Sequence, residues 1–316
     1  MISVRRYTPD DVDVWTNFNS RAKNSLFMFD RKYMDYHKDR FEDHSLLFYD
    51  EEKLIALLPM NIKGNELVSH GGLTYGGFIS DDKMKQHTMN DCFKALISYA
   101  KDIGIKKITY KCIPHIYHTQ AAEEDRFALF ANGAKLINVD VSTYLNLSTP
   151  LKMPKGRKAQ ISRAKREGVI VEELTGSEDF EAFIDLENSV LTKRYQVKAV
   201  HSGEELKMLH DKLPDNIHLF SAKKEGRLIA GTVVYEYDQV IHTQYMAADD
   251  EARIIGALDL TVATIISKYK ESKKWLDFGI STEHNEEAYL NEGLCSQKEG
   301  FGGRTGVYEL WELGIQ

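Results

Sequence analysis

The stretch Leu46-Leu-Phe-Tyr-Asp-Glu-Glu-Lys-Leu-Ile-Ala-Leu-Leu58 returns in the second half as His218-Leu-Phe-Ser-Ala-Lys-Lys-Glu-Gly-Arg-Leu-Ile-Ala-Gly231. Each copy contains an apolar run, a charged turn and a second apolar run that opens Leu-Ile-Ala, a pattern typical of a β-hairpin. Because other predicted elements recur around this hairpin at nearly the same offset, the chain is predicted to contain a duplicated unit.

The segments before the two hairpins also match. Residues 3–15 and 170–183 each predict a short alternating strand, then a threonine with small or acidic residues, then an apolar-periodic helix. Thr8 followed by Pro9 and Asp11 suits a helix start, since it combines a cap, a first-turn proline and an acid near the positive end of the helix dipole. The likeness therefore begins ahead of the hairpins.

The segments after the hairpins follow one order in both halves. Each half predicts a long helix (89–103 and 258–269), a β-rich strand (107–112 and 274–279) and a last strand (135–147 and 305–313). A further helix with a glycine corner is predicted before the last strand of each half. This order predicts a mixed-sheet α/β (α+β) unit used twice. We predict domains at residues 1–150 and 169–316, joined by a basic linker helix at 151–168.

Composition limits the function classes. A chain of 316 residues, 42% hydrophobic and 28% charged, suits two domains with packed cores. It has no apolar run of about 20 residues, as a membrane span needs, and its start lacks a signal-peptide core, so we expect a soluble cytoplasmic protein. Cys92, Cys112 and Cys295 lie far apart, which indicates neither a disulfide framework nor a zinc site. The net charge of −7 disfavours general nucleic-acid binding.

This unit order resembles that of the GNAT acyltransferase fold. The tandem arrangement, the basic segment 155–168 and the tail 294–302 look like the FemAB-type group, which includes BioF2-like acetyltransferase-domain proteins. The resemblance covers essentially the whole chain. It implies transfer of an acyl group from acyl-CoA or aminoacyl-tRNA to an amine on a sugar, a peptidoglycan stem peptide or a small metabolite.

The resemblance implies a donor site in the second half. In GNAT-like domains the fourth and fifth strands splay, and a freed strand N–H holds the acyl oxygen of the thioester. These strands correspond to residues 244–247 and 276–279, so Gln244, Met246 and Gly279 are assigned to donor binding. A plain strand end with a turn glycine is the alternative interpretation of Gly279.

A partial phosphate-loop pattern follows. Arg253-Ile-Ile-Gly256-Ala257-Leu258 fits Gln/Arg-x-x-Gly-x-Gly/Ala except at its last position, which Leu258 occupies. The N–H groups of a helix start would receive the pyrophosphate of CoA, although an ordinary helix N-terminus also explains the pattern. The first half has the acidic Ser80-Asp-Asp-Lys-Met at this place. We therefore assign the donor to the second half and expect the first half to have lost it.

The catalytic group is not settled by the sequence. Lys298 falls where FemAB-type proteins carry a lysine ahead of a Phe-Gly corner, which implies stabilisation of an oxyanion; a lysine at a helix C-terminus is the alternative. An attacking amine must also lose a proton. Asp277, inside an apolar strand, is a candidate base and equally a structural hydrogen-bond acceptor. The other candidates near the strand opening are Tyr245, His242, Glu283 and Glu236.

Acceptor binding is predicted from two segments. Residues 152–166 hold seven Lys/Arg and no acid, so Arg157 and Lys158 suit a diphosphate or a tRNA backbone, or simply a solvated bridging helix. Residues 69–78 carry two Gly-Gly pairs, a pliant backbone suited to an acceptor between this segment and the second-half opening. His70 and Tyr75 in this segment, and the cation Arg304, complete the predicted acceptor residues.

The sequence predicts an N-acyltransferase that uses an acyl-CoA, preferentially acetyl-CoA. The acceptor would be an amine of an amino sugar, a peptide or another cell-envelope or polysaccharide precursor. One alternative is an aminoacyl-tRNA-dependent, FemX-like aminoacyltransferase acting on a peptidoglycan precursor. Another is a non-catalytic GNAT-like protein that binds a nucleotide sugar or a partner. Nucleic acid other than tRNA is not expected, no metal is expected because the HxxH of His115 and His118 lacks a third ligand, and the oligomeric state stays open.

Overall fold

Both copies of the repeated hairpin form as predicted. The computed structural model describes residues 2–284 and 288–316. In it β3 (Leu46–Asp50) pairs antiparallel with β4 (Lys53–Leu58), and β11 (Ile217–Lys224) pairs antiparallel with β12 (Arg227–Glu236). Left-handed turn residues, Glu51 with φ 54° and Gly226 with φ 79°, match the right-handed twist of the strands that they join.

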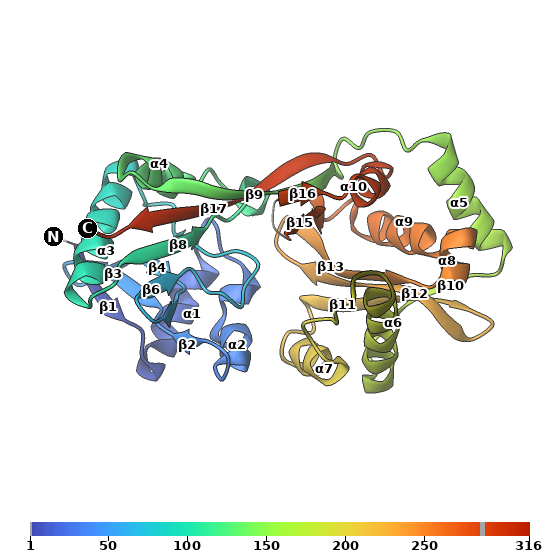
Figure 1. The fold of residues 1–316 in the computed structure, drawn as a ribbon, viewed down its shortest axis with the longest axis horizontal. Coiled ribbons are helices and arrows are strands. Elements are labelled where there is room, and N and C mark those ends of the chain that lie inside the picture. The colour runs from blue at the N-terminus through green and yellow to red at the C-terminus, as the bar shows by residue number, and fades with distance from the viewer. Residues whose placement is uncertain (1, 285–287) are drawn as a thin grey trace. The chain divides into compact units, whose positions relative to one another are not determined.

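The chain divides into two compact units (Figure 1). Unit 1 comprises Met1–Asp140 and Val307–Gln316, and unit 2 comprises Val141–Gly306. Strands and helices alternate in both units, so the predicted mixed α/β class is confirmed. Within the described residues, no helix combines the length and the apolar character that crossing a membrane requires.

Unit 2 is built on a mixed sheet with the strand order β10–β11–β12–β13–β14–β9. Neighbours are antiparallel, except that β13 and β14 are parallel. The bounds not yet given are β10 (Ile170–Leu174), β13 (Val240–Ala248), β14 (Trp275–Ile280) and β9 (Lys135–Asn146), with a separate hairpin of β15 (Thr282–His284) and β16 (Ala288–Leu290). Residues of β11 and β12 are buried almost throughout, as expected of central strands covered on both faces.

Helices cover both faces of this sheet. Figure 1 shows α6 (Ser177–Tyr195) and α7 (Gly203–Lys212) on one face and α9 (Ala257–Tyr269) on the other. The remaining helices of unit 2 are α5 (Lys155–Arg166), α8 (Asp250–Ile255) and α10 (Glu292–Glu299). The predicted helix at 258–269 is therefore confirmed as α9, whereas α8 is a short helix that the sequence pattern did not reveal.

Unit 1 has a similar succession of elements along the chain, but its strands are divided between two sheets. One sheet has the order β1–β3–β4–β7, and the strands β17–β8–β6–β5–β2 follow one another in a second sheet. The bounds of the other elements are β1 (Ile2–Arg6), β2 (Glu42–Asp43), β5 (Asn61–Lys63), β6 (Glu66–Val68), β7 (Ile79–Ser80), β8 (Lys107–Lys111), β17 (Arg304–Gly314), α1 (Val12–Ser20), α2 (Arg31–Met34), α3 (Gln86–Asp102) and α4 (Glu124–Ala131), with single turns of 3₁₀-helix at Pro9–Asp11, Phe27–Phe29, Asp35–His37 and His115–Tyr117.

The last strand of each sequence repeat lies in the unit of the other repeat. Residues 142–146 of β9, which close the first repeat, pair with β14 in unit 2. Residues 310–314 of β17, which close the second repeat, pair with β8 in unit 1. Each unit is therefore completed by a strand from the other half of the sequence.

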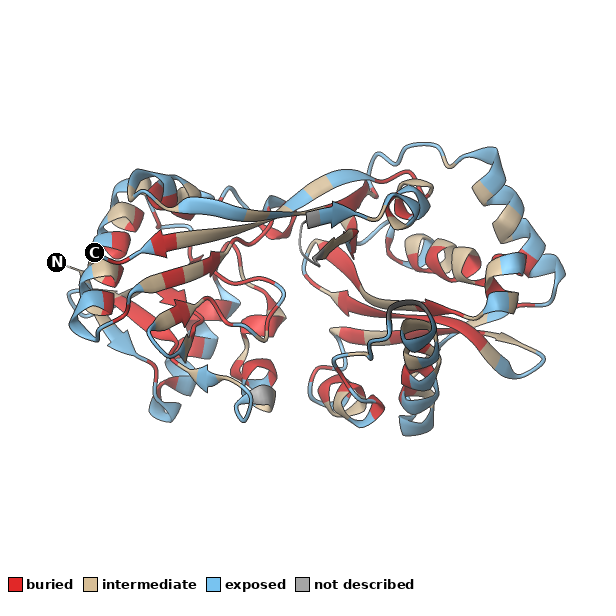
Figure 2. Ribbon diagram, viewed as in Figure 1, coloured by how far each residue is buried: buried red, intermediate tan, exposed pale blue. Residues whose placement is uncertain are grey.

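Each unit has its own apolar core (Figure 2). In unit 1, Phe48, Phe78 and Phe93 lie at the centre and are at most 1% exposed. In unit 2, Val234 and Ile265 lie between the sheet and α9 and are fully buried. Burial of such side chains, worth about 1.5–3 kcal/mol each, holds the helices against the strands and so positions the site described next.

Candidate active site

The parallel strands β13 and β14 separate after three residue pairs. Val240 pairs with Trp275, Ile241 with Leu276 and His242 with Asp277, and the pairing ends there although β13 continues to Ala248. The predicted parting of these strands is confirmed. Every second backbone N–H of β13 beyond His242 points to the side that β14 has left, so it lacks a ladder partner there.

Two irregularities shape the opening. Val233 and Val234 of β12 pair with Tyr245 and Thr243, so Gln244 is an extra, bulged residue of β13. In β14, a second register shift falls between Asp277 and Ile280. Bulges bend a strand and redirect its side chains, and they account here for the divergence of the two strands.

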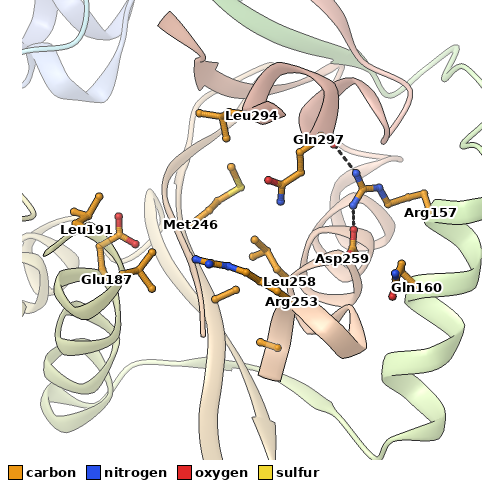
Figure 3. A pocket seen from close by; sticks show the side chains of 13 residues that line it. Arg157, Gln160, Glu187, Leu191, Met246, Arg253, Leu258, Asp259, Leu294 and Gln297 are labelled. Carbon is orange, nitrogen blue, oxygen red and sulfur yellow. Dashed lines mark hydrogen bonds and ion pairs between the residues drawn. The ribbon is translucent and has the colours of Figure 1, made fainter. Parts of the chain in front are cut away.

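A pocket of about 470 Å³ lies beside β13 (Figure 3). Its lining includes Glu187 and Leu191 of α6, Met246 of β13, Arg253 of α8, Leu258 of α9 and Leu294 of α10. Because α6 and α9 cover opposite faces of the sheet, a pocket that both helices line reaches both faces beside the end of β13, where β14 no longer pairs with it. The site is thus open to the two faces of unit 2.

Asp277 is fully buried at the closed end of the opening. Its Oδ1 accepts hydrogen bonds from Ser142 Oγ at 2.7 Å and from the N–H of Gly279 at 2.9 Å. Its Oδ2 lies 3.4 Å from Nδ1 of His242, another residue predicted to be catalytic. The predicted residues Asp277, His242 and Gly279 are therefore brought together, with Asp277 acting as an acceptor that holds the bulge of β14.

Lys298 joins this buried group from α10. Its Nζ donates to the carbonyl oxygens of Gly279 at 2.9 Å and Ile280 at 2.6 Å, and the residue is only 4% exposed. Burial lowers the pKa of Lys298 to about 8, against the opposing effect of the nearby Asp277 carboxylate. Lys298 is thus committed to two main-chain carbonyls and fastens α10 to the end of β14.

The predicted phosphate loop lies at the junction of α8 and α9. Gly256 has φ 81° and separates Arg253, in α8, from Ala257, the first residue of α9. A Cβ on Gly256 would lie 2.8 Å from the carbonyl oxygen of Gln160 in α5, so helix packing by itself requires this glycine. Arg253 and Leu258 line the pocket, which brings the free N–H groups of the first turn of α9 to its edge.

Arg157, predicted to bind substrate, lines the pocket but is engaged by other groups. Its guanidinium forms an ion pair with Asp259, donates to the carbonyl oxygen of Gln297 at 2.8 Å and lies 4.3 Å from the ring centre of Phe301. Burial lowers the pKa of Arg157. The side chain thus connects α5, α9 and α10, whereas its neighbour Lys158 is exposed on α5.

Other predicted residues of unit 2 do not line the pocket. The hydroxyl of Tyr245 lies 2.6 Å from Nδ1 of His201, and burial raises the pKa of Tyr245 to about 12. Glu283 accepts from Asn291 at 2.6 Å within the β15–β16 region, and Arg304 donates to the carbonyl of Gly303 at 2.6 Å. Glu236 forms an ion pair with Lys273 at 2.8 Å.

His70 and Tyr75 lie in unit 1, in the segment that follows β6, and β6 itself pairs with β8 over its whole length. The hydroxyl of Tyr75 hydrogen-bonds to Tyr117 and Tyr308, each at 2.8 Å, and Tyr75 is 1% exposed. Lys111 Nζ donates to the carbonyl of His70 at 3.2 Å. Both predicted acceptor residues are therefore buried within unit 1.

The two histidines of the HxxH segment lie in unit 1. Burial lowers the pKa of His118 to about 4, so this ring stays neutral at ordinary pH. Over the residues that the structure describes, no group of three or more His, Cys, Asp and Glu side chains is placed to hold a metal ion.

Glu187 is a pocket residue that the sequence reasoning missed. It follows Phe180, Phe183 and Ile184 at helical spacing, and all four residues are buried on one face of α6. An acid within an apolar helix face is uncommon, and it was the available signal. Burial raises the pKa of the Glu187 carboxyl to about 7.

Comparison with known proteins gives this fold and site a class. Residues 155–289 match the family model of the acetyltransferase (GNAT) domain. Most of unit 2 is therefore similar to a GNAT domain, and its strands β13 and β14 part where that fold predicts it. No curated protein matches the chain by sequence.

Solved structures extend the likeness to the whole chain. FemX has a TM-score of 0.69 at 12% identity, covering 99% of this chain and 97% of its own. L-PGS from Bacillus licheniformis has 0.64 at 14%, covering 97% and 92%, and a tandem GNAT protein from the clavulanic acid biosynthesis pathway has 0.56 at 10%, covering 100% and 99%. At such identities the likeness concerns the fold. The predicted resemblance to FemAB-type tandem GNAT proteins is thereby confirmed.

Proposed function

We propose that this protein is an N-acyltransferase whose donor, an acyl-CoA and in first place acetyl-CoA, binds in unit 2. The observation that carries the proposal is the parting of β13 and β14 after His242 and Asp277, beside a pocket that reaches both faces of the sheet. A thioester lying in this opening would place its carbonyl against an N–H of β13 that has no strand partner. A backbone N–H whose position is fixed before the reaction stabilises the oxyanion that forms during acyl transfer.

The polar end of the donor would lie at the start of α9. Arg253, whose side chain is 31% exposed, and the first-turn N–H groups of α9 offer positive charge to a pyrophosphate at the edge of the pocket. In unit 1, by contrast, every residue of the corresponding strand β6 pairs with β8. This difference supports the assignment of one donor per chain, held in unit 2.

The acceptor is proposed to be an amine of an amino sugar, a peptide or another cell-envelope precursor, and the reaction to take place in the cytoplasm, where acyl-CoA is made. The amine nitrogen would attack the thioester carbonyl, and the thiolate of CoA would leave. Catalysis would come mainly from orientation and from the backbone oxyanion contact. The tandem GNAT neighbour from the clavulanic acid pathway, which is described in a state without acetyl-CoA, is in keeping with this donor.

Isothermal titration of the protein with CoA and acetyl-CoA tests the donor. We expect saturable binding, and we expect Arg253→Ala to weaken it on the order of tenfold because one phosphate-facing cation is removed. Arg227→Ala is the matched control, since Arg227 lies in β12 outside the pocket and pairs with Asp249 at 2.7 Å. Absence of binding at millimolar CoA would refute the acyl-CoA donor.

An aminoacyl-tRNA donor is the second candidate, and the surface of α5 favours it. Lys158, Arg163 and Arg166 are exposed on this helix, together with Lys155 and Lys165. Such a cluster suits a phosphate backbone. The double variant Lys158→Glu, Arg163→Glu should then abolish binding of labelled aminoacyl-tRNA while CoA binding is unchanged; equal tRNA binding by the variant would exclude this candidate.

A further inference from the structure

We propose that Glu187 is the general base of the transfer reaction and takes the proton of the acceptor amine on the α6 side of the pocket. This inference rests on the proposed acyltransferase function and adds a catalytic residue to it. It also implies a direction: the donor enters from the face of α8 and α9, and the amine enters from the face of α6.

The position of Glu187 carries the first part of the argument. Glu187 lines the pocket from α6 and is 7% exposed. Its Oε2 is buried and has no hydrogen-bond partner among the described residues. A buried carboxyl without a partner destabilises the fold by several kcal/mol and contributes nothing to packing that a methylene chain would not. Such a group is expected where the reaction needs it.

The pocket geometry carries the second part. Figure 3 shows Glu187 on one side of the pocket and Met246 and Arg253 on the other, with the Arg253 side chain extending toward α6. Met246 belongs to the stretch of β13 that continues beyond its pairing with β14. An acceptor nitrogen between this strand and α6 would therefore have the thioester carbonyl on one side and the Glu187 carboxylate on the other.

The charges around the pocket leave Glu187 free to titrate. Arg157 and Asp259 neutralise each other in an ion pair, and the hydroxyl of Tyr245 is held by His201. Arg253 faces the pocket and lies 3.7 Å from Asp250. The raised pKa of Glu187 comes from burial and lies near 7, where a general base is most effective because both of its protonation states are populated.

The chemical step balances with these groups. The amine lone pair forms the N–C bond, the carbonyl electron pair moves to the oxygen against β13, and the amine proton passes to the Glu187 carboxylate. The oxyanion then re-forms the C=O bond, the C–S bond breaks, and the CoA thiolate leaves. Glu187 returns its proton to the thiolate, so that the products are an amide and the free thiol of CoA.

The test compares the wild-type chain with Glu187→Gln, Glu187→Asp and the control Asp185→Asn, which changes an exposed acid on the same helix. Thiol release from acetyl-CoA is followed with glucosamine, alanyl-alanine and hydroxylamine as amine probes, from about pH 5.5 to about pH 8.5. Binding of CoA is measured in parallel by titration calorimetry.

We expect Glu187→Gln to lower kcat/KM on the order of 100-fold or more, with CoA affinity within about twofold of wild type. The ratio of the wild-type rate to the variant rate should rise with pH near 7, where the Glu187 carboxyl loses its proton. The amine probe itself loses its proton in the same pH range with every variant, and this contribution cancels in the ratio of the two rates. Glu187→Asp should retain part of the activity and the pH dependence, and Asp185→Asn should behave as wild type.

Two different failures are distinguishable. If the wild-type protein releases no thiol with any probe amine, the proposed acyl-CoA function fails and this inference fails with it. If the wild type is active and Glu187→Gln keeps its rate, or loses rate with an unchanged pH profile, the inference alone is overturned and Glu187 has a structural role.

Discussion

At the scale of single residues, the buried carboxyl of Glu187 couples stability to pH. Its folded-state pKa is raised by burial to about 7, whereas an unfolded glutamate titrates near 4.5. A carboxyl group whose pKa is raised in the folded state favours folding only while it is protonated. The free energy of unfolding therefore falls as pH rises from about 4.5 to about 7 and stays low above it. Replacing the acid with neutral glutamine removes this loss.

We therefore predict that Glu187→Gln is more stable than wild type above neutral pH, by up to about 3 kcal/mol, and similar to it in acid, where both side chains are neutral. Urea unfolding of both proteins at about pH 5 and about pH 8 measures the difference. A variant that is less stable than wild type at the higher pH would mean that the carboxylate has a stabilising partner.

At the scale of elements, the pocket beside the opening between β13 and β14 can be closed by a larger side chain on β13. Met246→Trp would fill the pocket from β13, and we predict loss of CoA binding without loss of the fold, because Met246 is only partly buried. Ile254→Trp is the control, since Ile254 is 61% exposed on α8 and does not line the pocket. Titration calorimetry and circular dichroism check both variants, and unchanged CoA affinity in Met246→Trp would place the donor elsewhere.

The junction of α8 and α9 tests how closely α5 packs on it. Gly256 has φ 81° and a Cβ there would meet the main-chain oxygen of Gln160 at 2.8 Å, whereas Gly168, with φ 74° after α5, has open space around its Cβ position. We predict that Gly168→Ala destabilises by about 1 kcal/mol through backbone strain alone, and Gly256→Ala by a further 1–3 kcal/mol or so because helices α5 and α9 must move apart. Thermal unfolding of the two variants compares them directly; equal losses would contradict the packing argument.

At the scale of the whole molecule, the exchanged strands make each half of the sequence incomplete. The β8 strand has β17 as a neighbour and β14 has β9, so cutting the chain after Pro150 leaves unit 1 without β17 and unit 2 without β9. We predict that residues 1–150 and 151–316, produced separately, do not fold cooperatively, because each exposes a central strand as an edge. Mixed together, the two fragments should regain cooperative unfolding by circular dichroism. Cooperative unfolding of either fragment alone would show that the exchange is dispensable.

Much of the fold was determined by the sequence by itself. The two hairpins, the long helices and the strands at 107–112 and 274–279 depend on local periodicities of two and 3.6 residues, which the residues express directly. The parting of β13 and β14 and the GNAT class followed from the element order together with the family resemblance. The local elements among these features need no knowledge of distant contacts.

The tertiary structure alone decided the partners of the side chains and of the last strands. Periodicity predicted strands at 135–147 and 305–313, but an alternating strand can pair in either unit, and only the three-dimensional fold exchanges them. Only the three-dimensional fold likewise shows that main-chain carbonyl oxygens engage Lys298 and that Asp259 engages Arg157. Glu187 became a candidate base only when the structure placed it in the pocket without a partner, because burial and solvation depend on segments far away in the chain.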